Sequence, residues 1–443
     1  MMSQRAYQVM AALTFWTFAP PAPAGAQQEA ATASVTIRAD DVKRHTVELA
    51  DDKYDGRGAG YAGERRAADY IAAEFKRMGL VPAGDAGGYF QKFTFQPMHP
   101  VKPWAVLTSR NVLGRIEGAD PALRQEVVVI GAHYDGQGRT GQADPFRLPA
   151  PDGSTADEIW NSANDNAASV AVIIEVAGAL KRSPVAPKRS VLFIAFGAEE
   201  HGMTGSMHYV GHPVVPLTSH VAMINLEKIG RAPETPLNTS GNATSPAWDE
   251  VLKAAQGPMT APVMTNPFAI PDSDHYPFAA VRVPALVLHV SAWPDAHQPS
   301  DSADQIDFNR TAEVASFAMR ATLDLANRVQ RPAYAPAPMP DLGLSCHLAT
   351  AAEADARGVP APYGGLKVTG VIAGLPAAAT GLQPGDLIVE FAKSQFKRDD
   401  PLEKLMAMHR EVLEGKHGFV LPLKAVRGKK SLELTMKLRS PDQ

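Results

Sequence analysis

The sequence has a single cysteine and lacks several features that mark other classes of protein. One cysteine excludes an intramolecular disulfide, so burial of apolar side chains must stabilise the fold, and we expect Cys346 to be a small core residue. No HExxH and no GxSxG motif occurs, so the common single-zinc protease and serine-hydrolase signatures are missing. A net charge of −4 provides no basic field for nucleic acid or an anionic membrane surface.

No hydrophobic run is long enough to cross a membrane comfortably, but the first 26 residues have the pattern of a secretory signal peptide. Arg5 precedes a short apolar stretch from Val9 to Phe18, and small residues follow at Ala24 and Ala26. We therefore expect cleavage after Ala26 and a periplasmic or secreted protein without a membrane span.

A proline-rich segment divides the remaining chain into two parts. The stretch QRPAYAPAPMP has little charge and no periodicity, which is typical of a semi-rigid linker. We predict a catalytic domain over residues 27–330, a linker over 331–341 and a small domain over 342–443.

Apolar runs alternate with helical patterns in the first domain. EVVVIGA, SVLFIAFGA, HVAMINL and ALVLHVS predict strands, whereas GERRAADYIAAEFKRMGL and NAASVAVIIEVAGALKR have helical spacing. Gly79 suits the end of the first helix, and Asp165 is expected to cap the start of the second. Strands that are apolar throughout are buried on both faces, so we predict an α/β fold, a three-layer α/β/α sandwich with a mixed, mainly parallel sheet.

Acidic and histidine residues follow each predicted strand, at the edge where functional sites of α/β sheets lie. Several carboxylates cannot all stay ionised in one cleft without a compensating cation. Carboxylate and imidazole ligands suit zinc, and a bridging carboxylate can hold two ions about 3.5–4 Å apart. Taken singly, each residue could be a helix cap or an exposed acid, but chance does not explain all of them: His133, Asp135, Asp165, Glu199, Glu200, Glu227 and His297.

Six short motifs occur in the order GAHYDG, NSANDNAAS, GAEEHGMTGS, INLEKIG, SDHYPF and HQPSD. In order and spacing they resemble the di-zinc aminopeptidases related to bacterial leucyl aminopeptidase and glutamate carboxypeptidase. The upstream segment DGRGAGYAGERRAADYIAAEFKRMGLVPAGDAGGYFQKF also resembles the opening of that family, so the likeness covers roughly residues 40–328. Each motif alone is weak, but six in order are specific.

The resemblance implies two zinc ions per chain and a metallo-aminopeptidase that acts on peptide substrates. His133, Asp165 and Glu227 would hold one ion. Asp165, Glu200 and His297 would hold the other, so Asp165 would bridge the pair. The family usually has aspartate at the position of Glu227, which moves the carboxylate by about one methylene and can change the spacing of the metals.

The resemblance also implies roles for residues that do not bind metal. Glu199 would be the general base that takes a proton from the bridging water and passes it to the leaving amine. Asp135 would accept a hydrogen bond from His133 and fix its tautomer, while Asp274 and His275 would line the substrate pocket. A tyrosine that often precedes the last histidine of the family is replaced by Ala296, so any contact it makes with substrate is absent here or supplied elsewhere.

The second domain resembles PDZ domains of the bacterial protease type. The resemblance rests on LPAAATGLQPGDLIVEFA, in which Gly385 and Asp386 predict a tight turn before a buried strand. Such a domain adds an extended peptide to a sheet edge, and Leu342, Gly343 and Leu344 would receive its terminal carboxylate. A domain that only packs on the catalytic domain or helps secretion is an equal alternative.

Two other functions stay open at this point. A single-zinc glutaminyl cyclase shares the fold and would use only Asp165, Glu200 and His297. A degenerate centre without turnover would leave a binding protein whose function lies after residue 341. Zinc content and activity on aminoacyl substrates separate these possibilities.

Overall fold

A computed structural model describes residues 36–97, 105–143, 147–148, 157–231, 234–270, 272–290, 295–335, 338–339, 342, 344–371, 376–391, 393–398 and 420–437. The predicted signal peptide, residues 1–26, lies outside these ranges. Within them, no helix combines the length and the apolar character that a membrane span needs.

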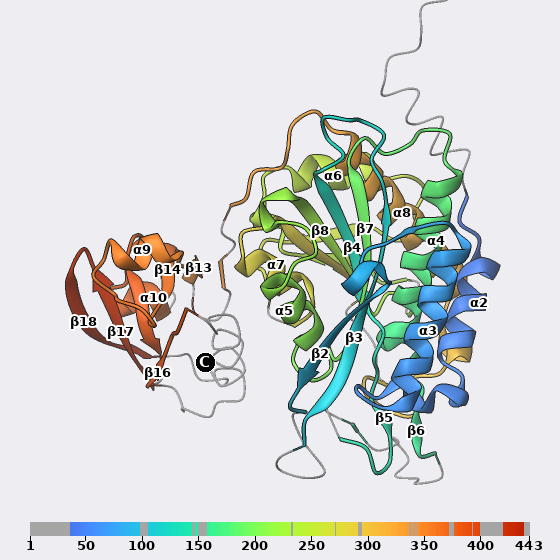
Figure 1. Ribbon diagram of the computed structural model, residues 1–443, viewed down its shortest axis with the longest axis horizontal. Helices are drawn as coiled ribbons and strands as arrows, with labels where there is room; N and C mark the ends of the chain where they lie inside the picture. Colours follow the sequence, from blue (N-terminus) through green and yellow to red (C-terminus); the bar gives the residue numbers. More distant parts are fainter. Residues whose placement is uncertain are drawn as a thin grey trace, which may run out of the picture.

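A nine-stranded mixed sheet forms the centre of the larger domain (Figure 1). Its strands are β1 (Val81–Pro82), β2 (Phe90–Phe95), β3 (Leu107–Ile116), β4 (Val127–His133), β7 (Ser190–Phe196), β8 (His220–Glu227), β9 (Leu237–Ser240), β10 (Val263–Asn266) and β11 (Ala285–His289). They lie in the order β1-β3-β7-β4-β8-β11-β9-β10, and β2 pairs with β3. The neighbours β7, β4, β8 and β11 are all parallel, which confirms the strands predicted from the four apolar runs.

Helices cover both faces of this sheet, as Figure 1 shows. They are α2 (Ala39–Leu49), α3 (Ala62–Arg77), α4 (Ala168–Arg182), α5 (Thr204–Gly211), α6 (Trp248–Ala255), α7 (His275–Ala280) and α8 (Phe308–Asn327). Successive side chains along β7 point to opposite faces of the sheet. Val191 and Phe193 belong to the core on the face covered by α2, α3, α4, α6 and α8. Leu192 and Ile194 belong to the core on the face covered by α5 and α7. The predicted three-layer sandwich is confirmed.

The structure tests two predictions about helix ends, one for Gly79 and one for Asp165. α3 buries Ala67, Ile71 and Phe75 on one side, and the chain leaves it through Gly79 at φ +71°, which confirms that prediction. The prediction that Asp165 caps the following helix is wrong. α4 begins at Ala168 without a side-chain cap, because Asp165 lies in the preceding helical turn, Ala163–Ala167, with non-helical dihedral angles.

The C-terminal domain is small and rich in β-strands, as predicted, and its sheet is antiparallel. Its strands are β12 (Pro338–Met339), β13 (Leu344–Leu348), β14 (Leu366–Val371), β15 (Leu387–Phe391), β16 (Ser394–Gln395), β17 (Val420–Arg427) and β18 (Lys430–Lys437). Two short helices, α9 (Ala351–Asp355) and α10 (Pro376–Thr380), accompany them. Gly385, at φ +95°, makes the turn before β15 that the sequence predicts. The single cysteine, Cys346, lies on β13, where burial raises the pKa of its thiol to about 12.

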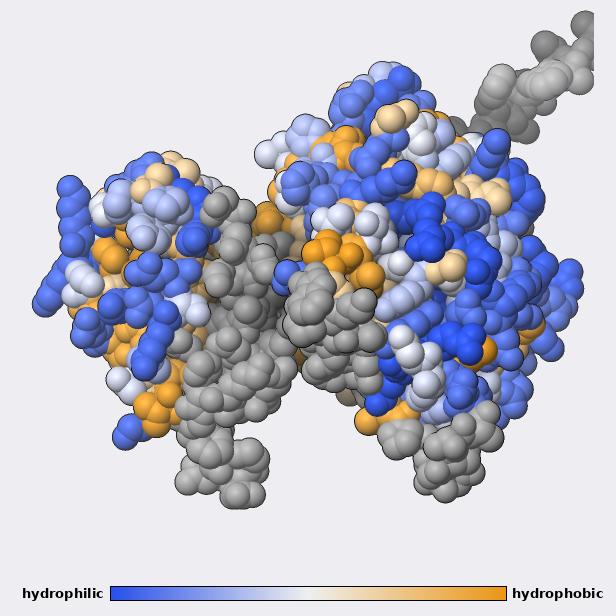
Figure 2. Space-filling model, turned by 60° about the horizontal axis from the view of Figure 1, so that its bottom comes forward, coloured by the Kyte–Doolittle hydropathy of each residue, from blue (hydrophilic) through white to orange (hydrophobic). Residues whose placement is uncertain are grey.

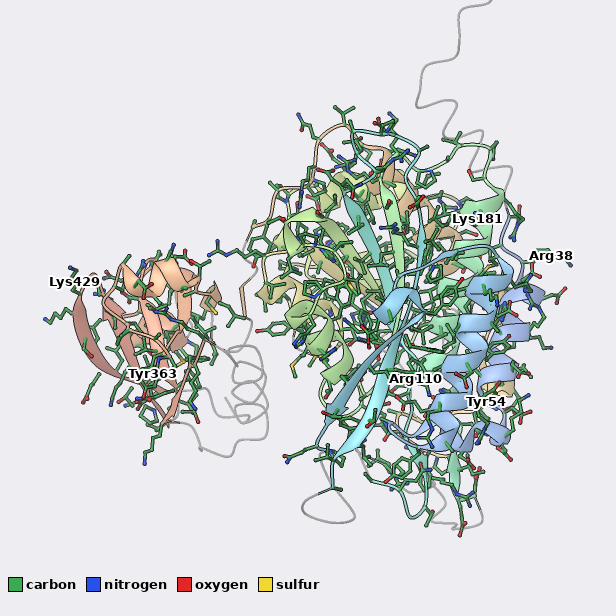
Figure 3. The ribbon with its side chains drawn as sticks, in the orientation of Figure 1. Arg38, Tyr54, Arg110, Lys181, Tyr363 and Lys429 are labelled. Atoms are coloured by element: carbon green, nitrogen blue, oxygen red, sulfur yellow. The ribbon has the colours of Figure 1, made fainter. Side chains whose placement is uncertain are left out.

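Side chains of the two domains meet at α7 and α9. Arg282 follows α7, and its guanidinium pairs with the Glu353 carboxylate at 3.0 Å. Figure 3 shows side chains filling the space between sheet and helices in both domains, with Tyr54 in the larger and Tyr363 in the smaller one. The face in Figure 2 is mainly hydrophilic, with hydrophobic residues in small groups.

A close contact at the start of α3 generates a stability prediction. A Cβ atom on Gly63 would lie 1.8 Å from the main-chain oxygen of Tyr54. We expect Gly63→Ala to lower the free energy of unfolding by at least about 2 kcal/mol, because backbone has to shift, measured by urea denaturation. Gly211→Ala is the control, since nothing lies within 4 Å of its Cβ position, and its effect should stay within about 1 kcal/mol. Equal effects of the two substitutions would contradict this packing.

Candidate metal centre

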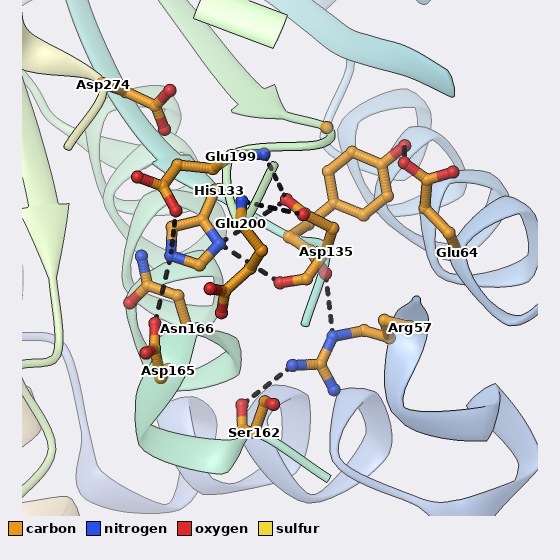
Figure 4. Close-up of polar contacts among 12 residues, drawn as sticks. Arg57, Glu64, His133, Asp135, Ser162, Asp165, Asn166, Glu199, Glu200 and Asp274 are labelled. Carbon is orange, nitrogen blue, oxygen red and sulfur yellow. Dashed lines mark hydrogen bonds and ion pairs between the residues drawn. The ribbon is translucent and has the colours of Figure 1, made fainter. Parts of the chain in front are cut away.

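The carboxyl ends of the central strands bring the predicted site residues together. β4 ends at His133 and β8 ends at Glu227. Beyond β7 the chain turns at Ala198, with φ +55°, and then presents Glu199 and Glu200. Because these strands are parallel and adjacent, their ends meet at one edge of the sheet, and Figure 4 shows the resulting cluster.

One group of possible metal ligands forms around His133. Its Nε2 atom lies 3.1 Å from Asp165 Oδ1 and 3.3 Å from Glu227 Oε1. The ligand atoms of these three residues all lie within 4.8 Å of one another, and all three side chains are buried. One cation could contact all of them.

A second group shares Asp165 with the first. His297 Nε2 lies 3.1 Å from Asp165 Oδ2 and 3.5 Å from Glu200 Oε2. The two oxygens of Asp165 therefore face different groups, which is the arrangement of a carboxylate that bridges two cations.

The donor atoms themselves fit such ions. Each oxygen of Asp165 faces a histidine nitrogen that could itself bind a metal, and Oε1 of Glu200 is buried without a hydrogen-bond partner among the described residues. Buried polar atoms normally have a partner, so the Glu200 oxygen needs one that the described residues do not supply. A mixture of imidazole nitrogen and carboxylate oxygen is the ligand set that zinc prefers.

The two adjacent glutamates diverge. Glu200 points to Asp165 and His297, whereas Glu199 Oε2 lies 3.8 Å from His133 Nε2 and belongs to neither group of three. Burial raises the pKa of Glu199 well above its usual range, and the charge of Glu227 adds to this effect. Glu199 is thus placed beside the cluster as a carboxyl group that readily holds a proton.

The predicted hydrogen bond from His133 to Asp135 is present, and its acceptor is the main-chain oxygen of Asp135. His133 Nδ1 lies 3.1 Å from the main-chain oxygen of Asp135 and 3.6 Å from its carboxylate. The carboxylate instead accepts the main-chain N–H groups of Glu199, at 3.0 Å, and Glu200, at 3.2 Å. Asp135 therefore orients both glutamates as well as the histidine.

Burial and mutual repulsion alter the acidity of this cluster. Burial, reinforced by the charge of Asp165, raises the pKa of Glu200 to about 7. Burial alone would lower the pKa of His297, but Glu200 and Asp165 raise it to about 9. The pKa of Asp165 is held well below its usual range despite burial, because Lys228 and His133 stabilise the carboxylate. The cluster therefore retains protons at neutral pH when no cation is bound.

Two residues that the sequence did not mark complete the surroundings of Asp165. The carboxylate of Asp301 accepts the main-chain N–H groups of Asn164, at 2.9 Å, and Asp165, at 3.0 Å. Lys228 Nζ lies 2.8 Å from Glu227 Oε1 and 4.0 Å from Asp165 Oδ2. Both stand inside the quoted motifs, HQPSD and INLEKIG, but their contacts depend on how distant loops meet.

Arg57 is a third residue that the sequence analysis missed. Its guanidinium is fully buried and donates to four main-chain oxygens, two of which are Tyr134 O, between His133 and Asp135, and Ser162 O, ahead of Asp165. Residues 55–57 all adopt left-handed dihedral angles, which cost about 1–2 kcal/mol per non-glycine residue. Figure 4 shows Arg57 below Asp135 and above Ser162, where it ties two ligand-bearing segments together.

The remaining predicted site residues lie differently. Asp274 and His275 are completely buried, so neither presents an exposed atom to a substrate, and Asp274 contacts the Ser206 hydroxyl. Leu342 and Leu344 are also buried, and Gly343 lies outside the described residues. The edge of β13 at Leu344 already pairs with β12, so it is not open to an added peptide there.

This chain is similar in sequence and in fold to proteins described as zinc aminopeptidases and exopeptidases. The model of Peptidase family M28 matches residues 111–322 of this chain. Aminopeptidase YwaD from Bacillus subtilis (strain 168) is 26% identical over 248 residues, 52% of this chain and 48% of that protein. The chain thus spans about half the length of this curated relative.

Solved structures share the fold. An aminopeptidase from Aneurinibacillus sp. strain AM-1 matches with a TM-score of 0.53 at 16% identity, over 70% of this chain and 98% of that chain. A glutaminyl cyclase from Porphyromonas gingivalis matches with a TM-score of 0.50 at 16% identity, over 65% of this chain and 98% of that chain. An aminopeptidase and a glutaminyl cyclase therefore both have this fold.

The position of Arg57 generates a prediction about the centre. We expect Arg57→Lys to weaken zinc binding or turnover about 10- to 100-fold, because lysine cannot reproduce the fork that fixes Tyr134 and Ser162. Zinc titration and kcat would be measured beside thermal melting. Arg189→Lys is the matched control, since Arg189 is equally buried but precedes β7 at the opposite end of the sheet. Equal zinc affinity and kcat in the two variants would contradict a positioning role.

The raised pKa values of Glu200 and His297 predict how zinc binding depends on pH. Both groups must lose protons to become ligands, so zinc affinity should rise as pH rises from 6 to 8, by up to about tenfold per pH unit for each proton displaced. Calorimetry in buffers of different ionisation enthalpy would count the protons released. An affinity that is constant over this range, with no proton release, would refute the electrostatic description.

Proposed function

We propose that the protein is an exported zinc-dependent aminopeptidase that removes single residues from the N-terminus of peptides. The observation that carries the proposal is the position of Asp165, whose two oxygens face two separate groups of zinc-type ligands. The aminopeptidase relative and the family match of residues 111–322 support the reaction class.

The chain's own residues would divide the reaction between them. Zinc in these positions would lower the pKa of a bound water and polarise the scissile carbonyl. Glu199 Oε2 would accept the proton of that water and then donate it to the leaving amine, so no covalent intermediate is needed. The Asp135 carboxylate would hold Glu199 in place by accepting a hydrogen bond from the main-chain N–H group of Glu199.

The surplus of carboxylates would also favour a substrate with a free N-terminal ammonium. Glu199, Glu200, Asp165 and Glu227 lie together, and burial has removed most of their hydration. A positively charged group on the substrate is stabilised near such acids, whereas a blocked N-terminus is not. This preference would make the enzyme an exopeptidase.

Export and peptide binding by the C-terminal domain complete the proposal. The signal-peptide pattern of residues 1–26 supports export. The antiparallel sheet and the turn at Gly385 agree with a PDZ-like domain, which would bind a peptide C-terminus. Since β12 covers part of β13, a peptide would have to pair beyond Ser345 or displace β12.

A single-zinc glutaminyl cyclase is the second candidate. The observation that favours it is Lys228, whose ammonium lies at the oxygen of Glu227 that also faces His133. Such an enzyme would retain only the ligands Asp165, Glu200 and His297. Cyclisation of an N-terminal glutaminyl substrate, without hydrolysis of aminoacyl-anilides, would select it.

The proposed activity predicts metal-dependent hydrolysis through Glu199. We expect the purified chain to cleave at least one member of a panel of aminoacyl-anilides, and to lose this activity on chelation and recover it with zinc. Glu199→Gln should bind zinc normally but lower kcat about 10²- to 10⁴-fold, because the amide cannot accept the proton.

Glu117→Gln serves as the control because Glu117 is exposed, and it should leave kcat unchanged. A fully zinc-loaded protein that cleaves no substrate on the panel would reject the aminopeptidase function. A zinc-loaded Glu199→Gln variant with normal turnover would remove only the role of Glu199 as base.

A further inference from the structure

The two ligand groups differ in one respect, which is the presence of a lysine. Lys228 Nζ lies 2.8 Å from Glu227 Oε1, a ligand atom of the His133 group, but 4.0 Å from Asp165 Oδ2, the oxygen that faces His297. Within the described part of the chain, no lysine or arginine forms an ion pair with Glu200. The ammonium therefore contacts the His133 group closely, whereas the group of Asp165, Glu200 and His297 has only the longer contact at Asp165.

The ammonium and a zinc ion compete for the same oxygen. Glu227 Oε1 is the atom that faces His133 Nε2 at 3.3 Å, and it is also the atom that Lys228 contacts. A divalent ion bound there would stand beside a positive charge in a buried site, where repulsion is weakly screened. Binding at this group thus requires the lysine side chain to move.

The structure allows the side chain to move while its backbone stays fixed. The main-chain N–H of Lys228 donates to Asn166 Oδ1 at 3.1 Å, and the residue has a left-handed φ of +52° directly after β8. Its side chain is 25% exposed, so a route to solvent exists. Displacement of the ammonium by zinc then breaks its ion pairs with Glu227 and Asp165 without disturbing the strand that carries Glu227.

We propose that Lys228 makes the two zinc positions unequal in affinity. Zinc fills the group of Asp165, Glu200 and His297 first. It enters the group of His133, Asp165 and Glu227 only when the Lys228 ammonium moves away. This inference rests on the proposed zinc centre and concerns its loading, whatever substrate it acts on. At limiting zinc the protein holds one ion and one ammonium, and the second ion is the exchangeable one.

Zinc titrations of three forms of the full chain test the proposal. In the wild type we expect two steps, with the second dissociation constant at least about 100-fold weaker than the first. Lys228→Met keeps the length of the side chain but removes its charge, and it should tighten the second step at least tenfold while the first changes less than threefold. Lys228→Arg keeps the charge and should retain two unequal steps.

A matched control and a second measurement complete the test. Lys181→Met removes an exposed lysine in the last turn of α4, at the opposite end of that helix from Asp165, and should titrate as the wild type does. If Lys228→Met does not fold, stepwise cobalt titration of the wild type, followed by its visible absorption, still reports whether loading is sequential.

The outcomes separate this inference from the proposed function. Equal affinities in the wild type, or an unchanged second step in Lys228→Met, would overturn it. Sequential loading without cleavage of any aminoacyl substrate would leave it standing while the proposed function fails. A wild type that binds no zinc would reject both.

Discussion

The concentration of carboxylates at one edge of the sheet is the constraint on which the rest of this structure depends. Asp165, Glu200 and Glu227 are buried, Glu199 is mostly buried, and all four lie within a few ångströms of two histidines. Burial raises the pKa of Glu199 and of Glu200, so the cluster either holds protons or binds positive charge. Lys228 supplies one such charge, and the buried Oε1 of Glu200, which has no hydrogen-bond partner among the described residues, leaves room for another.

The surroundings of the cluster keep the acids in fixed directions. Asp135 and Asp301 each accept two main-chain N–H groups, and thereby orient the glutamate pair and the turn that carries Asp165. The Arg57 guanidinium donates to the main-chain oxygens of Tyr134, next to His133, and of Ser162, three residues before Asp165. The acidic residues Asp135 and Asp301 and the basic residue Arg57 therefore hold the metal ligands in place through hydrogen bonds, against the mutual repulsion of the carboxylates.

The sequence reveals the sheet and the clustering of ligands because both follow from patterns along the chain. Strands that are apolar throughout must be buried on both faces, and acids that follow parallel strands must meet at one edge. The contacts of Arg57 could not be predicted, since its acceptors Tyr134 and Ser162 lie 77 and 105 residues away. Asp165 was misassigned as a cap because a local pattern cannot show that its carboxylate faces two histidines.

Anomalous diffraction at the zinc absorption edge, from crystals of the full chain grown with zinc, tests the central claim most directly. The account predicts a strong peak about 2.0–2.2 Å from ligand atoms of Asp165, Glu200 and His297, with a weaker peak among His133, Asp165 and Glu227. Crystals that show no zinc beside Asp165, with the carboxylates turned away from one another, would contradict it.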